Sequence, residues 1–589
     1  MIYIQTYRYN LKICFKKGMI NSLKKIKNFI KQHIVIILTT LIYAIISFIN
    51  LGTLTNPQTF WKAEIQNDFV EFEVKDNPKY ISKMRYFFGV IAGDYDIYIS
   101  QDGTSYEFLE SIEKNYEFSW NDINVGKTIN KMKIVSKTDN TYIGEIQLYD
   151  KDGEKIFLKD LNGNAELLID EPDTVPERIG YINSAYFDEI YHARTAYENV
   201  HNLDIYEWTH PPLGKLIIAI PIVFLKMNTF AYRLMGNLVG IAMIPIMYLL
   251  GLTIFKEKKY ANFAAFLIAC DGMHFAQTRI ATVDSFLVFF IMLSFLFMFR
   301  YITLEETDRL KDKLKNLCLS GVFVGMAIAT KWTGFYAGLG LAIIFFANLF
   351  KRLVIDKVDF SKERLLIIFK EKKWTKEASV IIANCAVFFI WIPIFIYALS
   401  YFPFYRNGRI TDWASFWEVQ SNMYNYHSKL EATHFFSSSW YTWPLMLKPV
   451  WYFERDYGID GYSTISGMGN PIIWWIGIIG IIYTIIKLLM KLDKKSWMIT
   501  IPILSMFLPY VGITRVMFLY HYFPVVPFMM LAIVNLMKKI TEKTRKNYIL
   551  LAVASIILIA FIYFYPVISG LVVPKSYIDS TKWLSTWYY

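Results

Sequence analysis

Cysteine is scarce in this chain, which has four cysteines among 589 residues. None lies in the long polar segment 56–172, so no disulfide framework is available there. The cysteines lie instead in the amino-terminal segment or in apolar runs, at Cys14, Cys270, Cys318 and Cys385. No Cys or His spacing matches a zinc site. The sequence therefore predicts neither a disulfide-stabilised fold nor a structural zinc site.

Charged residues are also few. They make up 19% of the chain, against 54% for hydrophobic residues, and a soluble chain of this length would carry far more charge. The apolar residues come in runs of about 17 to 22, the length that crosses a hydrocarbon core of roughly 30 Å. The sequence therefore predicts a polytopic α-helical membrane protein.

RNA- and DNA-binding motifs are missing, although the net charge is +12. The basic residues lie in short segments between apolar runs, which is the pattern that sets the orientation of a membrane protein. We therefore predict no nucleic-acid partner. Internal repeats and low-complexity tracts are missing as well.

The amino-terminal segment 1–33 contains eight Lys and Arg residues and no acidic residue, and an apolar run from Ile34 to Leu51 follows it. A signal peptide is one interpretation, but the run is long and no small-residue cleavage site is obvious after it. We expect instead an uncleaved first transmembrane helix, 34–51, with its basic tail in the cytoplasm. Met19 is an alternative start.

Residues 56–172 have a different character, because apolar and polar side chains alternate along them. Examples are F-V-E-F-E-V at 69–74 and Y-D-I-Y-I-S at 95–100, and Asp-Gly turn signals separate such runs. This pattern predicts an antiparallel β-sandwich. The segment resembles discoidin-like, galactose-binding-like domains. That resemblance implies binding of a glycan or cell wall, and the alternative is a spacer or packing domain.

The remaining apolar runs are separated by connectors that alternate in charge. The runs cover 231–255, 260–278, 283–302, 316–331, 333–350, 378–400, 471–490, 497–513, 516–537 and 548–568. Every second connector is rich in Lys and is therefore expected in the cytoplasm: Lys256–Lys259, Leu304–Lys315, Lys351–Lys376, Lys491–Lys495 and Lys538–Lys546.

The short run after Pro212 holds Lys215 and fits this alternation only as an interfacial or re-entrant helix. The result is about eleven spans, with the amino end inside and the carboxyl end outside. The sandwich then lies outside, before a membrane core at 180–400, an outer loop at 401–470 and carboxyl-terminal spans at 471–589.

Several ionisable side chains face outside together in this topology. Such residues are costly at the ends of apolar runs unless they pair, reach water or bind a ligand. One alone is explained by snorkelling or by setting topology, whereas several together favour a site for a lipid-linked anion. They are Asp188, Glu189, Lys215, Arg233, Arg279, Asp284 and Lys331.

Seven motifs occur in a fixed order along the chain. They are F-D-E at 187–189, H-P-P-L-G-K at 210–215, Q-T-R-I-A-T-V-D-S at 277–285, G-M-A-I-A-T-K-W-T-G at 325–334, W-P-L-M-L-K-P-V-W-Y at 443–452, G-N-P-I-I-W-W at 469–475 and Y-H-Y-F-P at 520–524. Together they resemble the protein O-mannosyltransferases, which are glycosyltransferases of the GT-C class. The resemblance covers about residues 180–540.

The resemblance implies a function at the outer face of the cell membrane. Mannose would pass from a polyprenyl-phosphate-mannose donor to a Ser or Thr hydroxyl of a protein acceptor. Two departures set this chain apart: it lacks the β-trefoil insertion of eukaryotic members and carries the sandwich instead, and it has His192 where the family usually has Tyr or Phe. The first departure is consistent with a bacterial member.

The resemblance also assigns roles to residues. Asp188 would be the general base, and Glu189 would orient it or bind the acceptor backbone; from the residues alone, the pair could equally be an acidic helix cap. Arg279 is the first candidate for the donor phosphate, because guanidinium binds phosphate bidentately; Lys215, Lys331, Arg233 and Arg515 are further candidates. The candidate substrate-binding residues are His210, His192, Asp284, Trp443 and His521.

Several of these assignments have plain alternatives. His192 is explained as well by packing, and the tryptophans by an interfacial aromatic belt. No residue spacing demands a metal or other cofactor, although related GT-C oligosaccharyltransferases use a metal ion. Two alternative functions are a GT-C enzyme acting on a lipid or cell-wall polymer and a transporter of lipid-linked sugar. The transporter would require inverted repeats, which are missing.

Overall fold

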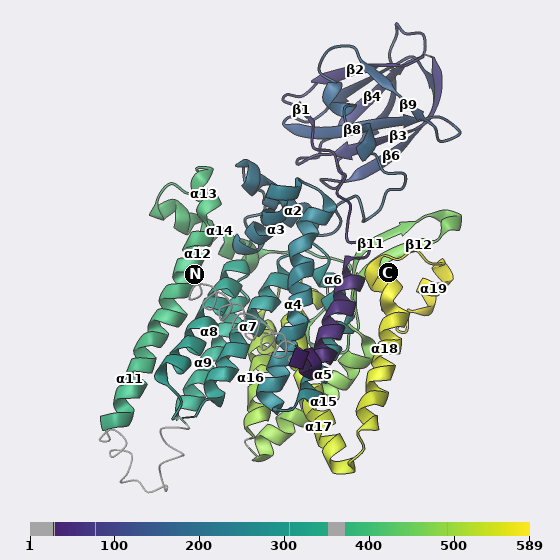
Figure 1. Cartoon of the computed structure of the whole chain (residues 1–589). Coiled ribbons are helices and arrows are strands. Elements are labelled where there is room, and N and C mark those ends of the chain that lie inside the picture. Colours follow the sequence, from purple (N-terminus) through teal and green to yellow (C-terminus); the bar gives the residue numbers. More distant parts are fainter. Residues whose placement is uncertain (1–26, 29, 77, 306, 351–371, 492) are drawn as a thin grey trace, which may run out of the picture.

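The computed structural model describes residues 27–28, 30–76, 78–305, 307–350, 372–491 and 493–589. It contains a bundle of long helices and a β-domain that stands beyond one end of the bundle (Figure 1). Most of the predicted basic tail, with Cys14 and Met19, lies outside the described residues, as does most of the connector Lys351–Lys376.

The β-domain consists of two five-stranded antiparallel sheets. One has the order β1-β8-β3-β6 with β9 beside β8, and the other has the order β10-β2-β7-β4-β5. The strands are β1 (Trp61–Ala63), β2 (Phe69–Val74), β3 (Lys79–Phe88), β4 (Tyr95–Ser100), β5 (Glu107–Ile112), β6 (Trp120–Ile129), β7 (Lys131–Ser136), β8 (Thr141–Tyr149), β9 (Lys155–Ile156) and β10 (Leu158–Asp160). The predicted all-β domain is confirmed.

Alternation along the strands explains why these residues form a sandwich. In β2, Val70, Phe72 and Val74 are fully buried, whereas the residues between them are partly exposed. Residues of the other sheet, such as Ile81 of β3 and Ile143 of β8, lie in the same apolar core. Successive side chains of a strand point to opposite faces, so a period of two buries one face.

The helical part begins with the helix Ile30–Phe48 and resumes after the β-domain. Its helices are α2 (Glu189–His201), α3 (Leu213–Leu225), α4 (Thr229–Phe255), α5 (Lys258–Ala269), α6 (Gly272–Thr278), α7 (Asp284–Thr303), α8 (Leu310–Thr330), α9 (Gly334–Phe350), α11 (Lys372–Ala386), α12 (Ile392–Ser400), α13 (Phe402–Arg406), α14 (Trp413–Lys429), α15 (Pro471–Lys491), α16 (Lys494–Phe507), α17 (Val526–Thr544), α18 (Tyr548–Ser569) and α19 (Lys575–Ser580). A hairpin of β11 (Val450–Asp456) and β12 (Tyr462–Gly467) precedes α15.

Seven helices among the described residues are long and apolar enough to cross a membrane, and α3 and α9 are shorter apolar helices. The chain is therefore a multi-pass membrane protein, while the predicted number of about eleven spans is not confirmed. The run 260–278 does not form one helix. Asp271 interrupts it, because its side chain accepts a hydrogen bond from the backbone N–H of His274 and so starts the separate helix α6.

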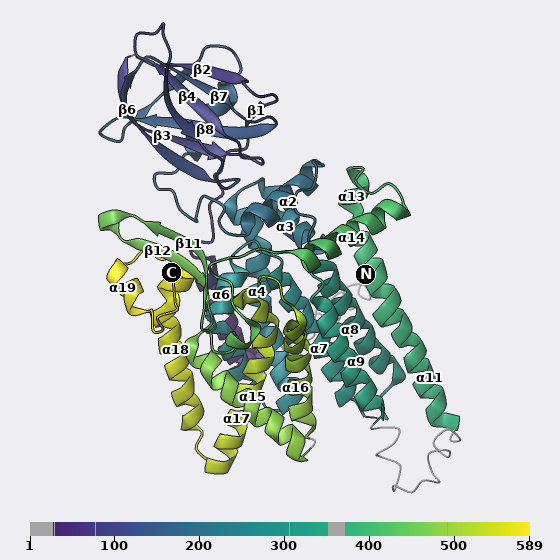
Figure 2. The same ribbon diagram turned by 180° about the vertical axis from the view of Figure 1, so that it is seen from behind.

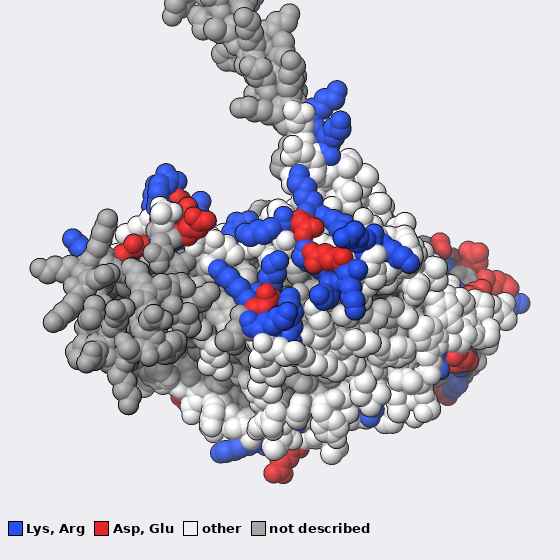
Figure 3. All heavy atoms as spheres, turned by 90° about the horizontal axis from the view of Figure 1, so that it is seen from below, with Lys and Arg blue, Asp and Glu red and all other residues white. Residues whose placement is uncertain are grey.

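One end of the helical bundle carries the polar elements. The β-domain, α2, α13, α14 and the β11–β12 hairpin all lie at this end, and so does α19 near the carboxyl terminus (Figures 1 and 2). The opposite face gathers Lys and Arg side chains with fewer acidic ones (Figure 3). The predicted basic connectors at 256–259, 491–495 and 538–546 follow α4, α15 and α17. These three helices end at that face, away from the β-domain.

Candidate active site

The backbone immediately before α2 is held in a strained conformation. Phe187 has a φ of 51°, which is uncommon for a bulky side chain. Its ring lies 4.4 Å from that of Tyr452 in β11, measured between centroids, and 6.2 Å from that of Tyr520. These aromatic contacts stabilise the turn and place Asp188 at the start of α2.

Glu189 is fully committed to structural contacts. Its two carboxylate oxygens accept hydrogen bonds from Arg233 Nε at 2.7 Å and Nη2 at 2.6 Å. They also accept the backbone N–H groups of Ala281 and Tyr186. Glu189 and Arg233 are 0% and 1% exposed. Both carboxylate oxygens of Glu189 are therefore occupied by donors of the fold, and the residue anchors α2 to α4.

Asp188 lies beside Glu189 but has a different environment. It is half-buried, and within the described residues its carboxylate accepts no hydrogen bond and forms no ion pair. Loss of contact with water, followed by the nearby charge of Asp284, raises the pKa of Asp188 to about 7, although Lys331 acts in the opposite direction. A carboxylate with a pKa near neutrality is suited to general-base chemistry.

Lys331 and Asp284 form an ion pair next to Asp188. The distance from Lys331 Nζ to Asp284 Oδ1 is 2.9 Å, and both side chains are at most 10% exposed. Asp284 begins α7, and Lys331 caps the carboxyl end of α8. Lys331 also lies 5.8 Å above the Tyr520 ring. The pair therefore places a cation near Asp188, and Asp284 partly neutralises its charge.

Glu207 is a buried acid that the sequence analysis missed. It forms an ion pair with Lys215 of α3, which is 0% exposed, and its Oε1 lies 3.1 Å from His210 Nδ1. Lys215 also donates to the backbone carbonyl of His210 at 2.8 Å. Burial by itself raises the pKa of Glu207. The charges of Lys215 and His210 nevertheless hold this pKa well below its usual value. The sequence feature that could have indicated Glu207 is Lys215, because a lysine in an apolar run needs a nearby counter-charge.

Two other histidines adjoin this network. His192 Nδ1 lies 4.0 Å from Glu207 Oε2, and the His192 and His210 rings are 5.9 Å apart. Burial lowers the pKa of His192 to about 3, so the imidazole is neutral at pH 7. His427 of α14 binds the backbone carbonyl of Thr209 at 2.6 Å through Nε2. The network thus joins α2, α3 and α14 at the end of the bundle that carries the β-domain.

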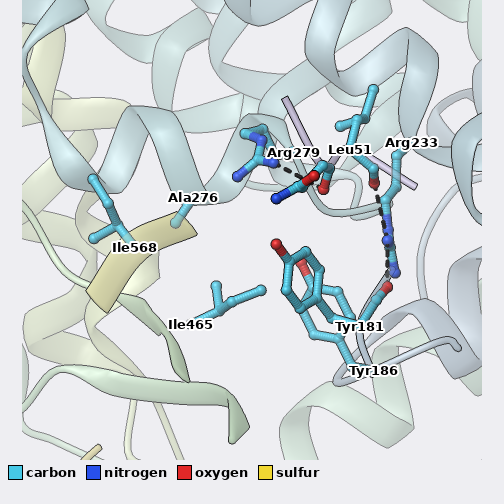
Figure 4. Close-up of a pocket in the computed structure, with 9 residues that line it drawn as sticks. Leu51, Tyr181, Tyr186, Arg233, Ala276, Arg279, Ile465 and Ile568 are labelled. Atoms are coloured by element: carbon cyan, nitrogen blue, oxygen red, sulfur yellow. Dashed lines mark hydrogen bonds between the residues drawn. The ribbon is translucent and has the colours of Figure 1, made fainter. Parts of the chain in front are cut away.

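Arg279 binds backbone carbonyls. Its guanidinium donates to Ser47 at 3.0 Å, Ile49 at 2.6 Å and Asn50 at 3.1 Å, and it is 5% exposed. Arg279 and Arg233 line a small cavity of about 10 Å³ together with Tyr181 and Tyr186 (Figure 4). These contacts satisfy the last carbonyls of the helix Ile30–Phe48 and its following turn, and the cavity has room for about one water molecule.

The guanidinium of Arg515 forms no hydrogen bond and no ion pair within the described part of the chain. It is half-buried and lines an open hollow of about 710 Å³ between the segments 432–441 and 513–517. His434 and Trp440 line the same hollow. The charge of Arg515 acts on Tyr520 and His521, and Tyr520 also lies beside Lys331. Of the five candidate cations for the donor phosphate, Arg515 is the one that has neither an acidic partner nor a backbone carbonyl partner among the described residues, whereas Arg279 is held by carbonyls and the other three by acids.

Trp443 and His521 lie behind this hollow. Their rings are stacked, with centroids 5.9 Å apart and planes inclined by 18°. Trp443 is 0% exposed, and its indole N–H donates to Ser438 Oγ at 3.1 Å. His521 is 6% exposed and its Nδ1 lies 3.1 Å from the Phe518 carbonyl oxygen. In this conformation the two rings support the wall of the hollow and present little surface to a substrate.

Two family models match the helical part of the chain. The model described as dolichyl-phosphate-mannose-protein mannosyltransferase matches residues 220–405. The model described as the C-terminal four TMM region of protein-O-mannosyltransferase matches residues 412–587. The chain belongs to the protein O-mannosyltransferase family. The family predicted from the seven motifs is confirmed.

Three known protein O-mannosyltransferases are similar to this chain over more than 80% of their own length. A polyprenol-phosphate-mannose–protein mannosyltransferase of Mycolicibacterium smegmatis is 24% identical over 466 residues, covering 68% of this chain and 87% of the relative. One of Corynebacterium glutamicum is 21% identical over 431 residues, covering 64% and 81%. The solved structure of the S. cerevisiae protein O-mannosyltransferase Pmt1-Pmt2 complex bound to the sugar donor superposes with a TM-score of 0.58 at 13% identity, over 69% of this chain and 89% of that chain. The predicted GT-C fold is confirmed.

Proposed function

We propose that this protein O-mannosyltransferase transfers mannose from a polyprenyl-phosphate-mannose donor to Ser or Thr hydroxyl groups of proteins. The observation that carries the proposal is the contrast at the start of α2. Asp188 is unpaired and half-buried beside the Lys331–Asp284 pair, whereas Glu189 is bound by Arg233. Within a family of mannosyltransferases, an unpaired carboxylate with a pKa of about 7 fits the general base.

The reaction is a single displacement at the anomeric carbon. The acceptor hydroxyl oxygen forms a bond to that carbon while its proton passes to Asp188. The bond from the anomeric carbon to the phosphate oxygen breaks, and polyprenyl phosphate leaves with the electron pair. A direct displacement of this kind inverts the configuration at the anomeric carbon, which product analysis can measure.

The leaving phosphate needs positive charge more than it needs a proton. Arg515 supplies an unpaired guanidinium at the rim of the 710 Å³ hollow. Lys331 adds a second cation, since it lies among Asp188, Asp284 and Tyr520. Arg279, Arg233 and Lys215 support the fold of the site through their buried partners.

The orientation proposed for the membrane places this chemistry outside the cytoplasm. The face that gathers Lys and Arg side chains lies opposite the β-domain and α2 (Figures 1 and 3). Connectors rich in basic residues stay preferentially in the cytoplasm. The site and the β-domain then lie together on the outer side of the cell membrane.

A glycan or cell-wall contact through the β-domain is a further part of the proposal. Phe69, Tyr106 and Phe108 are 41%, 36% and 54% exposed. Lys133 lies 3.8 Å above the Phe69 ring and forms an ion pair with Glu71 at 3.5 Å. Exposed rings with polar neighbours are suited to stacking on sugars. The test measures binding of the purified full-length protein to cell-wall polysaccharide. It compares the wild type with the β-domain variants Phe69→Ala and Phe108→Ala.

The test of function is a transfer assay with the purified protein. It combines polyprenyl-phosphate-mannose with a peptide containing Ser and Thr, and compares the wild type with Asp188→Asn. We expect transfer by the wild type and a loss of at least about a thousandfold in the folded variant. Parallel reactions with lipid and polymer acceptors and with other sugar donors address the alternatives. Transfer to a lipid or polymer in place of the peptide would overturn the proposed acceptor.

A further inference from the structure

The β-domain is attached directly to the segment that carries Asp188. The connection between β5 and β6 lies on this segment. Its Phe118 carbonyl accepts the backbone N–H of Ala185 at 3.0 Å, and the backbone N–H of Trp120 donates to Ser184 Oγ at 3.0 Å. The β-domain therefore contacts the chain three residues before the proposed base.

A buried ion pair strengthens this attachment. Glu117 of the same connection accepts a hydrogen bond from Arg194 of α2 at 2.9 Å, with both side chains no more than 7% exposed. Arg194 also binds Glu198, four residues further along the helix, at 2.8 Å. The neighbouring Phe118 ring packs edge-on against Tyr197 of α2, with centroids 5.4 Å apart. Residues 117 and 118 are thus fixed against α2.

Tyr116 precedes this fixed pair and is 39% exposed. Two more exposed tyrosines lie in the same region: Tyr191 of α2, 40% exposed, and Tyr206, 48% exposed. The Tyr191 and Tyr206 rings are stacked, with centroids 6.2 Å apart and planes inclined by 8°. The Arg194 guanidinium that binds Glu117 lies 3.8 Å above the Tyr206 ring. Tyr191 and Tyr206 are therefore in ring contact, and Tyr116 directly precedes Glu117, which shares Arg194 with Tyr206.

These tyrosines lie next to Asp188. Tyr191 follows it by three residues, which places both side chains on one face at the start of α2. Loss of contact with water, and then the charge of Asp188, raises the pKa of both Tyr116 and Tyr191. Tyr116 belongs to the β-domain, so the charge of the proposed base reaches a residue outside the helical bundle.

We propose that Tyr116, Tyr191 and Tyr206 form the binding subsite for the acceptor polypeptide, and that the β-domain contributes one of the three rings. The inference rests on the proposed function and extends it. Tyrosine offers a large rigid surface and a polar tip at low entropic cost, which suits a peptide of varied sequence. The subsite lies at the end of the bundle that carries the β-domain (Figure 1), whereas a polyprenyl donor enters from the hydrocarbon region.

The test uses the full-length protein and separates the two substrates. Tyr116→Ala and Tyr191→Ala are each expected to raise the KM for a Ser/Thr peptide about tenfold. The KM for polyprenyl-phosphate-mannose and kcat should stay within about twofold of the wild type. Tyr116→Phe keeps the ring and should retain the wild-type peptide KM. The matched control is Tyr80→Ala, because Tyr80 is an exposed tyrosine of the same domain, at 47%, on β3.

Direct binding of a fluorescent Ser/Thr peptide distinguishes failure of this inference from failure of the proposed function. Weaker peptide binding in Tyr116→Ala and Tyr191→Ala, but not in Tyr80→Ala, supports the subsite even if no mannose is transferred. Unchanged peptide binding in both variants, or an equal rise in the KM values for peptide and donor, would overturn it. Wild-type protein that binds the peptide but transfers no mannose would refute the proposed function alone.

Discussion

The carboxylate of Glu189 and the guanidinium of Arg233 form a buried bidentate ion pair, with N–O distances of 2.6 and 2.7 Å. The pair joins the start of α2 to α4, and Arg233 also donates to the backbone carbonyls of Leu51 and Tyr181. Two adjacent acids of one motif therefore have separate tasks. Glu189 holds the helix in place, whereas the carboxylate of Asp188 has no hydrogen-bond or ion-pair partner among the described residues.

The first prediction concerns the stability of this pair. Glu189→Ala leaves the Arg233 guanidinium buried without its counter-charge, so we expect a loss of about 3 to 5 kcal/mol and little folded protein. Thermal unfolding in detergent and the yield of monodisperse protein measure this effect. The control is Asp460→Asn, which breaks the Arg178–Asp460 pair, whose side chains are 45% and 64% exposed. A surface pair contributes little, so this variant should match the wild type.

The second prediction is a pH dependence set by Asp188. A base must be ionised to accept a proton, and the pKa of Asp188 is about 7. We expect kcat/KM to fall about tenfold for each pH unit below 7 and to level off above it. A pH–rate profile from pH 5 to 9 measures this. A flat profile across that range would contradict the assignment of Asp188 as the base.

The same pKa makes a separate prediction about stability. The folded protein holds a proton on Asp188 up to about pH 7, whereas the unfolded chain releases it near pH 4. The stability that this proton contributes is therefore lost as the pH rises through 7. Asp188→Asn has no such loss, so its melting temperature should exceed that of the wild type at pH 8 and approach it at pH 5. A melting-temperature difference between the two proteins that is smaller at pH 8 than at pH 5 would contradict the raised pKa of Asp188.

The third prediction concerns Arg515 and the lipid-linked phosphate. Removing an unpaired guanidinium from the rim of the hollow should weaken donor binding, so Arg515→Ala is expected to raise the donor KM about 10- to 100-fold. Arg515→Lys should lie between this variant and the wild type. The matched control is Arg545→Ala, since Arg545 follows α17 at the opposite, basic face. Wild-type donor kinetics in Arg515→Ala would remove Arg515 from the phosphate site.

The fourth prediction concerns the buried Lys215–Glu207 pair. Glu207→Gln leaves the ammonium of Lys215 unpaired at a position that is 0% exposed, and we expect a loss of about 3 to 5 kcal/mol. The double variant Glu207→Gln with Lys215→Met removes both charges and should regain much of the melting temperature. Comparison of the single and double variants by thermal unfolding measures the coupling. Equal melting temperatures for the two variants would show that the pair is not coupled.

Much of the architecture was predictable because its signals are local. Apolar runs near 20 residues long indicate helices in lipid whatever surrounds them, and α4, α7, α15 and α18 follow such runs closely. Alternation along β2 and β4 indicates a sandwich for the same reason. The run 260–278 was less predictable, since the Asp271 cap that divides it accepts hydrogen bonds from Asn470 and Trp474, far away in the chain.

The site was predictable only in part. The motifs pointed to Asp188, Lys331 and Asp284, and the structure brings these three together. Arg279 was also ranked first for the phosphate, because a guanidinium group can bind phosphate bidentately. Its carbonyl partners at Ser47 and Ile49 lie 232 and 230 residues away, and no local pattern reveals them.

By itself, the sequence determined that this chain is a multi-pass membrane protein of the mannosyltransferase family with a β-domain inserted after its first helix. Those conclusions depend on periodicity, on run length and on ordered motifs, which are properties of neighbouring residues. Only the tertiary structure decided which charges are paired. Arg233 meets Glu189 across 44 residues, and Arg194 meets Glu117 across 77. A buried charge pairs with the group that the fold brings within about 3 Å. Glu189 has such a partner in Arg233, and Asp188 has none among the described residues.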